Sequence, residues 1–362
     1  MQAIISSIRQ TIRHHLNRIG CKYDYSAVMS KTYNGEGFYI NSRTKAAELN
    51  RIWGYDINWA YGGVLRNNIL PKTCRLGAKE TELGIFLISY KKIGNARYKD
   101  FHYTLYRKIK GELEKNVVEL GNGRQYRFVT NLDYLIFKDL YKVEGLRIEK
   151  QAFFQDLGKL ELEEIIDRAY IDKKRNAYPK NIFESCYYGL NAKKLWTYDN
   201  PKDYQKYIDS YNATGYSWCR SRYVPIAMFQ TAYLRYEEWQ LFKKYRDKIV
   251  YMNTDSIYTT EPVDIEDSSE IGHYHIEYNG EYIQFIRRSA YAILDNRKIL
   301  KEAKISGVLN EYVTNDDIKA LRAGKIIKCK SRDEFGKIVD IKVEPTFIRY
   351  YNGDTFNIKY SL

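Results

Sequence analysis

The stretch "KIVYMNTDSIYTT" (residues 248–260) decides the fold that we expect for this chain. Residues 248–251 and 256–260 are rich in β-branched and aromatic side chains, which favour strands, whereas Asn253, Thr254 and Asp255 are typical turn residues. The stretch therefore predicts a β-hairpin with one carboxylate at its tip. Because Asn and Asp are also common in turns without any chemical role, this hairpin alone leaves a structural and a functional interpretation open.

The length and composition place the chain among soluble globular proteins. Its 362 residues can form one large mixed domain or two to three lobes. No run approaches 18 consecutive apolar residues, so we expect no membrane partner, and we find no secretory segment. The five cysteines include no CxxC pair, which disfavours a structural zinc site and indicates reduced thiols. We therefore predict a cytoplasmic protein that is not secreted.

The charge and the aromatic content favour a nucleic-acid partner. Fifty-nine Lys and Arg residues against 45 Asp and Glu residues give a net charge of +14, and 36 residues are Tyr. Cationic side chains can follow phosphates while rings stack on bases. Many basic proteins bind no nucleic acid, so composition indicates this class without establishing it. The acid-free segment 1–20 predicts a basic amphipathic helix, which suits either a helix beside DNA or an organellar presequence.

Local patterns predict several further elements, and no flexible linker separates them. We expect a strand followed by a short helix in 51–71, ended by Pro71, with Asp56 near the end of the strand. The other expected elements are a capped helix at 130–141, a strand at 146–154, a helix pair at 157–175 and 180–190, a helix at 225–245 and a short helix at 314–323.

Asp56 and Asp255 both follow strand-like runs of buried residue types. If these strands are neighbours in one sheet, the two carboxylates converge, and they then need protons or a cation. Magnesium is held in nucleotide enzymes by one or two carboxylates together with substrate phosphates. Two such ions can bracket the attacking and leaving oxygens of an in-line phosphoryl transfer. A capping or turn role is the alternative for Asp56 alone.

Three segments, in this order, resemble motifs of family B DNA polymerases of the protein-primed phage type. They are "DINWAYG" (56–62) for motif A, "KNIFESCYYG" (180–189) for motif B and "YMNTDS" (251–256) for motif C. Further segments resemble the YxGG element, the segment between motifs B and C, the KxY motif and the stretch after it. These are "YNGEGF" (33–38), "VPIAMFQTAYLR" (224–235), "RRSAY" (287–291) and "KISG" (304–307).

The resemblance covers about residues 30–310 and implies an α+β right-hand polymerase. Its parts would be a palm with an antiparallel sheet, helical fingers and a small β-rich thumb. The implied boundaries are an N-terminal helix and linker strand (1–50), palm (51–71 and 223–307), fingers (151–190), thumb (308–362), and insertions like terminal-protein regions 1 and 2 (72–150 and 191–222).

The resemblance also implies site residues. Asp56 and Asp255 would be catalytic and would hold two Mg²⁺ ions, for which Mn²⁺ can substitute, with the backbone of Ile57 beside the triphosphate. The ring of Tyr61 would lie under the sugar and exclude a 2′-hydroxyl. The implied nucleotide-binding residues are Asn58, Tyr61, Lys180 and Tyr188. The implied DNA-binding residues are Tyr33, Gly35, Arg235, Thr254, Arg287, Arg288, Tyr291 and Lys304.

The sequence departs from the family pattern in four motifs, one of which is the YxGG element, loosened to Tyr33-Asn34-Gly35-Glu36-Gly37. Asn253 stands where the family has the first Asp of motif C, which weakens the negative field of the site. In motif B, counting forward from Lys180 selects Tyr187 and counting back from Gly189 selects Tyr188, and both registers stay open. Ser289 replaces the Lys of the KxY motif, and Arg287 or Arg288 would supply that charge.

The implied function is addition of deoxynucleotides to a primer 3′-OH or to a terminal-protein hydroxyl during phage or mobile-element replication. Strand displacement would accompany it. Too few residues precede Tyr33 for an exonuclease domain, so we expect an exonuclease-deficient polymerase. The expected partners are primer-template DNA, dNTPs, a terminal protein and a separate exonuclease. The alternatives are a catalytically weak polymerase-like DNA-binding subunit and an RNA-templated polymerase, which the content of motifs A and B disfavours.

Overall fold

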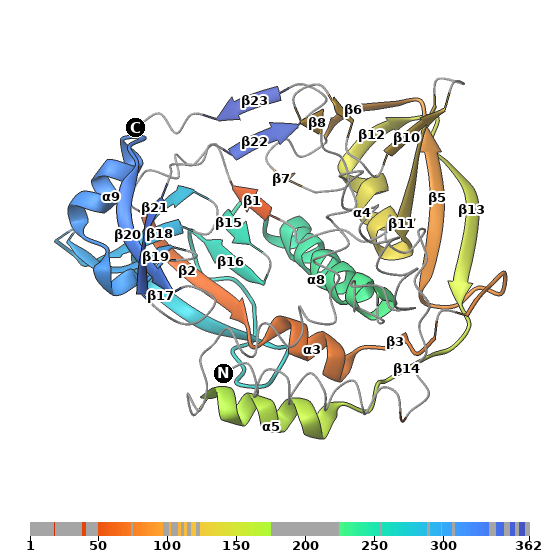
Figure 1. Cartoon of the computed structure of the whole chain (residues 1–362), viewed down its shortest axis with the longest axis horizontal. Coiled ribbons are helices and arrows are strands. Elements are labelled where there is room, and N and C mark those ends of the chain that lie inside the picture. Colours follow the sequence, from red (N-terminus) through yellow and green to blue (C-terminus); the bar gives the residue numbers. More distant parts are fainter. Residues whose placement is uncertain are drawn as a thin grey trace, which may run out of the picture.

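A computed structural model gives the architecture of the chain (Figure 1). It describes residues 50–73, 75–96, 124–174, 224–253, 255–287, 290–297, 299–305, 308–332 and 338–343, with Arg18 and a few short strands elsewhere.

An eight-stranded antiparallel sheet contains the predicted hairpin. Its strand order is β19-β18-β17-β2-β16-β15-β1-β7, so β2 lies directly beside β16. The hairpin of β15 and β16 and the strand that carries Asp56 are therefore neighbours, as the sequence argument required. The strands are β1 (Phe38–Ile40), β2 (Asn50–Ile57), β7 (Phe101–His102), β15 (Ile249–Asn253), β16 (Ser256–Thr259), β17 (Tyr274–Arg287), β18 (Ala290–Leu294) and β19 (Leu300–Ile305).

A second sheet of five strands lies on the other side of the molecule, in the order β10-β11-β5-β13-β4. The boundary that we predicted between residues 150 and 151 falls inside β13, because that strand stays paired with β5 as far as Phe153. The strands are β4 (Leu76–Gly77), β5 (Gly84–Tyr90), β10 (Val117–Leu120), β11 (Arg124–Thr130) and β13 (Arg147–Phe154).

Five two-stranded ladders complete the described strands. They are β3 (Leu70–Pro71) with β14 (Leu157–Gly158), β6 (Lys92–Ala96) with β12 (Tyr141–Glu144), β8 (Lys108–Ile109) with β9 (Glu112–Leu113), β20 (Ile327–Arg332) with β21 (Ile338–Val343), and β22 (Ile348–Tyr351) with β23 (Thr355–Ile358).

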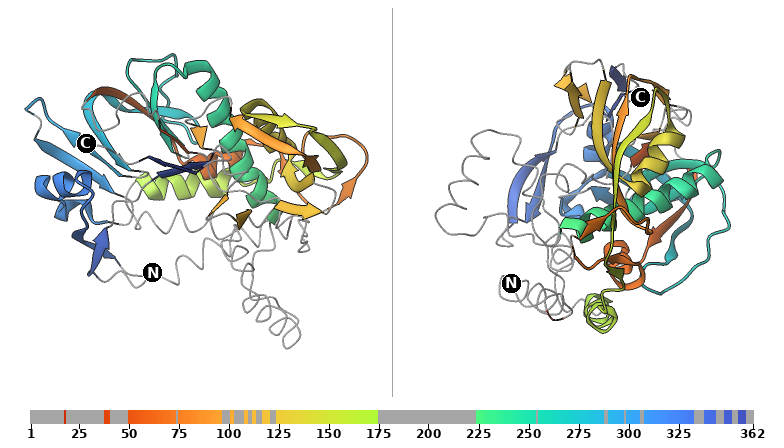
Figure 2. Two further views of the ribbon diagram at one scale, coloured as in Figure 1. Left: turned by 90° about the horizontal axis from the view of Figure 1, so that it is seen from above. Right: turned by 90° about the vertical axis from the view of Figure 1, so that its right-hand side faces the viewer.

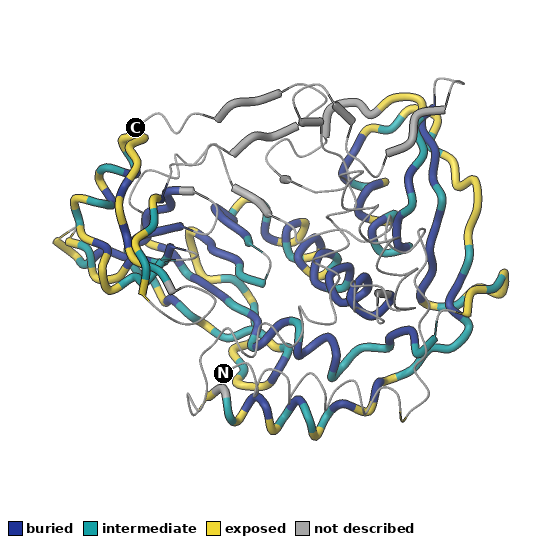
Figure 3. The backbone as a smooth tube through the Cα atoms, viewed as in Figure 1, coloured by how far each residue is buried: buried dark blue, intermediate teal, exposed yellow. Residues whose placement is uncertain are grey.

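Helix α8 (Val224–Tyr245) runs between the two sheets, and the further views in Figure 2 show the same placement. Its residues are buried along most of its length (Figure 3), so it carries apolar side chains on several faces rather than on one stripe. Phe229 packs in the core cluster with α3 (Ala60–Asn67), whereas Trp239 and Phe242 pack in the cluster with α4 (Asn131–Leu140). The helix thus joins the two sheets into one body.

The remaining helices largely agree with the sequence patterns. Helix α4 begins after Thr130, whose side chain accepts from the Asp133 amide, and α9 (Asn315–Arg322) begins with a Thr314–Asp317 capping box. Helix α5 (Glu163–Lys174) begins six residues later than we predicted, because Leu157 and Gly158 pair with β3. A 3₁₀ turn, η2, spans Asn310–Tyr312. The helices predicted at 1–20 and 180–190 lie outside the described residues.

The side chains of strand β2 alternate between the two faces of the sheet, and these faces have different surroundings. Tyr55 and Ile57 belong to core clusters shared with α8, whereas Ile52 belongs to a cluster of tyrosines on the opposite face. Because side chains alternate along a strand, Gly54 and Asp56 point to the same face as Ile52. Asp56 therefore ends a row on the sheet face that lies away from α8. No described helix is long and apolar enough to cross a membrane.

Candidate active site

Asp56 and Asp255 lie side by side at one end of the eight-stranded sheet. Ser256, which follows Asp255, is the cross-strand partner of Asp56. The backbone N–H of Ile57 donates to the carbonyl oxygen of Asp255 at 3.0 Å. Both aspartates are half-buried. The predicted convergence of the two strands is therefore confirmed.

The electrostatics around this pair are acidic. Burial raises the pKa of the Tyr274 hydroxyl well above its usual range, and nearby carboxylates raise it further. Two of these are Glu237 and Glu238 on α8, and the other two are Asp255 and Asp56. Four carboxylates thus act on one phenol, and the tyrosine stays a neutral hydroxyl. Burial raises the pKa of Glu237 itself to about 7, so this carboxyl is only partly ionised at neutral pH.

The two aspartates fit magnesium by their chemistry. Both offer hard oxygen donors, and Mg²⁺ is commonly held by one or two carboxylates while water and substrate phosphates complete its shell. Among the residues that the structure describes, no group of three His, Cys, Asp or Glu side chains could hold a metal ion. The side chains here that offer oxygen donors of this kind are the carboxylates of Asp56 and Asp255.

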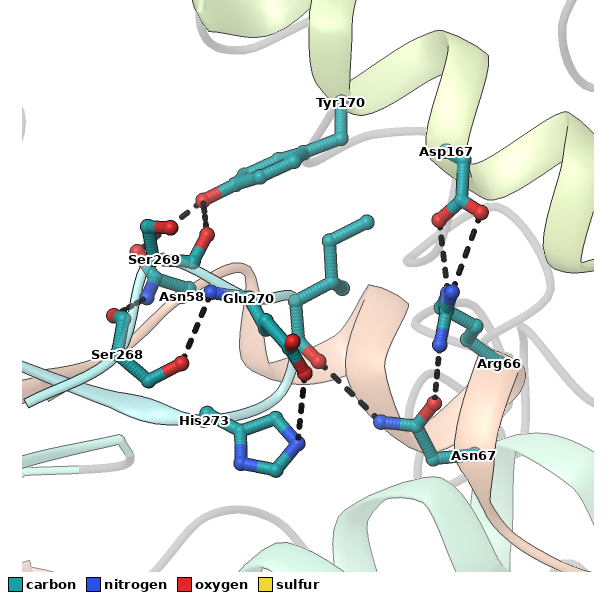
Figure 4. Close-up of polar contacts among 10 residues, drawn as sticks. Asn58, Arg66, Asn67, Asp167, Tyr170, Ser268, Ser269, Glu270 and His273 are labelled. Carbon is teal, nitrogen blue, oxygen red and sulfur yellow. Dashed lines mark hydrogen bonds and ion pairs between the residues drawn. The ribbon is translucent and has the colours of Figure 1, made fainter. Parts of the chain in front are cut away.

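Asn58 forms side-chain hydrogen bonds within the protein, and its contact with a nucleotide stays a prediction. Its Nδ2 donates to the carbonyl oxygen of Ser268 at 2.7 Å. Its Oδ1 accepts from the hydroxyl of Tyr170 at 3.1 Å (Figure 4). Both ends of the amide are thus used, and Asn58 holds the turn after β2 in place.

Tyr61 lies in the first turn of α3 and is half-buried against the core. Its backbone oxygen accepts from Nε2 of Gln230 at 2.8 Å, a bond to a fully buried residue of α8. Together with the hydrogen bonds of Asn58, this bond to α8 fixes the position of the first turn of α3. The predicted role of the ring against a sugar stays a prediction.

Arg235 is placed differently from its predicted contact with DNA. Its side chain is 1% exposed and forms two hydrogen bonds of 2.9 Å with Asp133 of α4, which is itself fully buried. A guanidinium enclosed in this way has no surface to offer a phosphate. Arg235 instead joins α8 to α4 through a buried ion pair.

Two other predicted DNA contacts lie on β18 and β19. Tyr291 and Lys304 are cross-strand partners. Lys304 is half-exposed and lies 2.9 Å from Glu302, so its charge is near the surface. Of the remaining predicted residues, Arg287 is described only by its backbone in β17. Tyr33, Gly35, Lys180, Tyr188, Thr254 and Arg288 lie outside the described residues.

A cluster of tyrosines covers the sheet face behind Asp56. The hydroxyls of Tyr258 and Tyr291 lie 3.0 Å apart, and burial raises the pKa of Tyr258 well above its usual range and that of Tyr291 to about 12. Tyr258 also donates to Glu277 at 3.3 Å. At Gly54 a Cβ would lie 2.6 Å from the ring of Tyr278, so only glycine lets the rings approach the strand. The cluster makes a rigid floor beside the aspartates.

His275 is a residue of the site that the sequence argument missed. It is the cross-strand partner of Asp56 on β17, so the two side chains lie on the same face. Its Nδ1 is buried without a hydrogen-bond partner among the described residues. No motif marks it, because only the register of β17 against β2 brings it there.

The fold is similar to that of known DNA polymerases. Phi29 DNA polymerase in complex with primer-template DNA and incoming nucleotides matches with a TM-score of 0.60 and 17% identity, over 98% of this chain and 67% of that chain. The same polymerase with primer-template DNA gives 0.58 and 17% over the same shares. With single-stranded DNA it gives 0.56 and 16%, over 97% of this chain and 67% of that one. No family model and no curated protein matches the sequence. The chain therefore has a DNA polymerase fold.

Proposed function

We propose that this chain is a DNA-directed DNA polymerase that adds deoxynucleotides to a primer 3′-OH by two-metal phosphoryl transfer. One observation carries the proposal: Asp56 and Asp255, far apart in the sequence, lie at one end of an antiparallel sheet in a polymerase fold. The similar Phi29 structures hold primer-template DNA, which supports DNA as the partner.

The eight-stranded sheet would be the palm, α5 the start of the fingers, and the segment after β19 the thumb. In this arrangement Asp56 and Asp255 would be the residues that hold the metal ions. Bound Mg²⁺ would neutralise the phosphate charge and activate the primer hydroxyl for in-line attack. The ring of Tyr61 excludes a 2′-hydroxyl, and Lys180 and Tyr188 of the motif B-like segment bind the triphosphate and the nascent base pair. The segments 72–150 and 191–222 would serve protein priming and strand displacement.

The second candidate is a polymerase-like DNA-binding subunit with weak catalysis. Asn253 favours it, because the site has one carboxylate fewer than the motif that it resembles. The two candidates differ in one measurement, primer extension by purified protein that has first been shown to bind the same primer-template. The polymerase extends the primer with Mg²⁺ or Mn²⁺, whereas the subunit binds without extension in either metal.

A further inference from the structure

The turn that follows Asp56 is strained and needs external restraint. Strand β2 ends at Ile57 and α3 begins at Ala60, so only Asn58 and Trp59 connect the strand to the helix. Trp59 adopts the left-handed conformation, with φ 52° and ψ 58°. For a residue with a Cβ this conformation is unfavourable, and it persists where the surroundings fix it. The position of Asp56 depends on whatever fixes this turn.

Asn58 is the residue through which the turn is fixed. Its N–H donates to the carbonyl oxygen of His273 at 2.9 Å, and its own carbonyl oxygen accepts from Gly272 at 2.7 Å. Its side chain bonds Ser268 and Tyr170 as described above. Each of its backbone and side-chain polar groups thus makes a hydrogen bond with the 268–273 loop or with α5, and Figure 4 shows those of the side chain.

Tyr170 supplies the contact from α5. Its ring stacks on Trp59 with centroids 5.7 Å apart and planes 15° apart. Its hydroxyl lies 3.1 Å from Oδ1 of Asn58 and 3.5 Å from the carbonyl oxygen of Ser269, and the single proton favours the shorter contact. Tyr170 therefore touches both residues of the turn, one through its ring and one through its hydroxyl.

A second contact of α5, made with α3 instead of with the turn, offers a matched comparison. Arg66 of α3 binds both carboxylate oxygens of Asp167 at 2.7 and 3.2 Å. Asp167 lies three residues before Tyr170 and so on the same face of α5. This ion pair holds α5 against α3 but touches neither Asn58 nor Trp59. It stabilises the interface without contacting the turn.

We propose that Tyr170 is a positioning residue for the candidate metal site, acting through Asn58 on the turn that directly follows Asp56 and strand β2. This inference rests on the proposed function. Along the chain, α5 leads to the motif B-like segment 180–189. The helix that precedes the proposed nucleotide-binding residues in the sequence thus contacts the turn that follows Asp56.

Mn²⁺ binding to the full chain without DNA or nucleotide tests this role, with free Mn²⁺ followed by electron paramagnetic resonance. We define site-specific binding as the share of the Mn²⁺ binding that is lost in the variant Asp255→Asn. Tyr170→Phe keeps the ring on Trp59 and deletes only the hydroxyl. We expect it to weaken site-specific binding about two- to tenfold, the worth of one hydrogen bond. Asp167→Asn should leave Mn²⁺ binding unchanged. It should nevertheless lower resistance to urea at least as much as Tyr170→Phe does.

A double-mutant cycle completes the test. Asn58→Ala should also weaken Mn²⁺ binding, and Tyr170→Phe should add nothing in that background. The role of Tyr170 would be overturned if Tyr170→Phe and Asp167→Asn weakened Mn²⁺ binding equally, or if Tyr170→Phe bound Mn²⁺ as wild type does. Either result would leave the proposed function standing. A wild-type protein that neither binds Mn²⁺ at Asp255 nor extends a primer would overturn the proposed function and this inference with it.

Discussion

At the scale of the residue, Asn253 is the position where the candidate site is incomplete. It is the last residue of β15, and its carbonyl oxygen accepts from the Asp255 amide at 2.8 Å and from the Ser256 hydroxyl at 3.1 Å. The backbone of Asn253 thus closes the hairpin turn, while its neutral amide adds no charge beside the two aspartates. A carboxylate there would have nearly the same shape and would raise the ligand charge.

Asn253→Asp should therefore strengthen metal binding and raise extension at low Mg²⁺ by about threefold or more. The measurement is a series of extension rates against Mg²⁺ concentration. The matched control is Asn296→Asp, since Asn296 is exposed. Unchanged or lower activity in Asn253→Asp would show that the site is built for the amide.

Tyr61→Val should relax the choice of sugar, because the smaller side chain leaves room for a 2′-hydroxyl. We expect the preference for dNTP over rNTP to fall by about tenfold or more. Single-nucleotide incorporation with each substrate measures this ratio, and Tyr312→Val, at a 44% exposed tyrosine, is the control. A ratio that stays at the wild-type value would remove Tyr61 from the sugar site.

At the scale of the element, α8 and α4 are joined by the Arg235–Asp133 pair. Asp133 also accepts from the hydroxyl of Thr130, the N-cap of α4, so its carboxylate is satisfied from two sides. Removing the guanidinium leaves this carboxylate buried and without its main partner. Breaking a buried pair in this way costs far more than the pair itself contributes.

Arg235→Met should lower the free energy of unfolding by about 3–5 kcal/mol. The double variant Arg235→Met with Asp133→Leu should recover much of that loss, because neither charge is then left alone. Urea unfolding of the three proteins measures both effects. A small loss in the single variant would contradict the structural role that we assign to Arg235.

The elements that sequence could predict are those with a local signal. The hairpin around Asp255, the strand and turn at Asp56, and helices α4, α8 and α9 follow from turn residues, caps and periodicity. Arg235 was misassigned because an arginine on a helix is normally expected to be exposed. Its buried partner, Asp133, lies more than 100 residues earlier in the chain, so no local pattern indicates the pair. His275 and Tyr170 were missed because strand register and helix docking, rather than any motif, bring them to the turn.

At the scale of the whole molecule, α8 joins two sheets into one body that carries a net charge of +14. The order of the five-stranded sheet, whose strands come from across residues 76–154, had no local signal and could not be predicted. The net charge, in contrast, follows directly from the composition. A positive net charge attracts polyanions such as DNA.

Binding to primer-template DNA should consequently weaken with salt. Each phosphate contact made by a Lys or Arg side chain releases counterions, so several contacts make the dissociation constant rise by about tenfold or more between about 50 and 200 mM NaCl. Fluorescence anisotropy of a labelled primer-template measures this. Affinity that does not change with salt would contradict a cationic DNA-binding surface.

The most direct test of the central claim is template-directed incorporation of a single dNTP by the purified chain. Wild type should incorporate the matched nucleotide with Mg²⁺ or Mn²⁺. Asp255→Asn should lose this activity while it still binds DNA, and Asp316→Asn, at a 91% exposed carboxylate, should keep it. Incorporation that survives in Asp255→Asn, or its absence in a DNA-binding wild type with both metals, would contradict the claim that Asp56 and Asp255 form a polymerase active site.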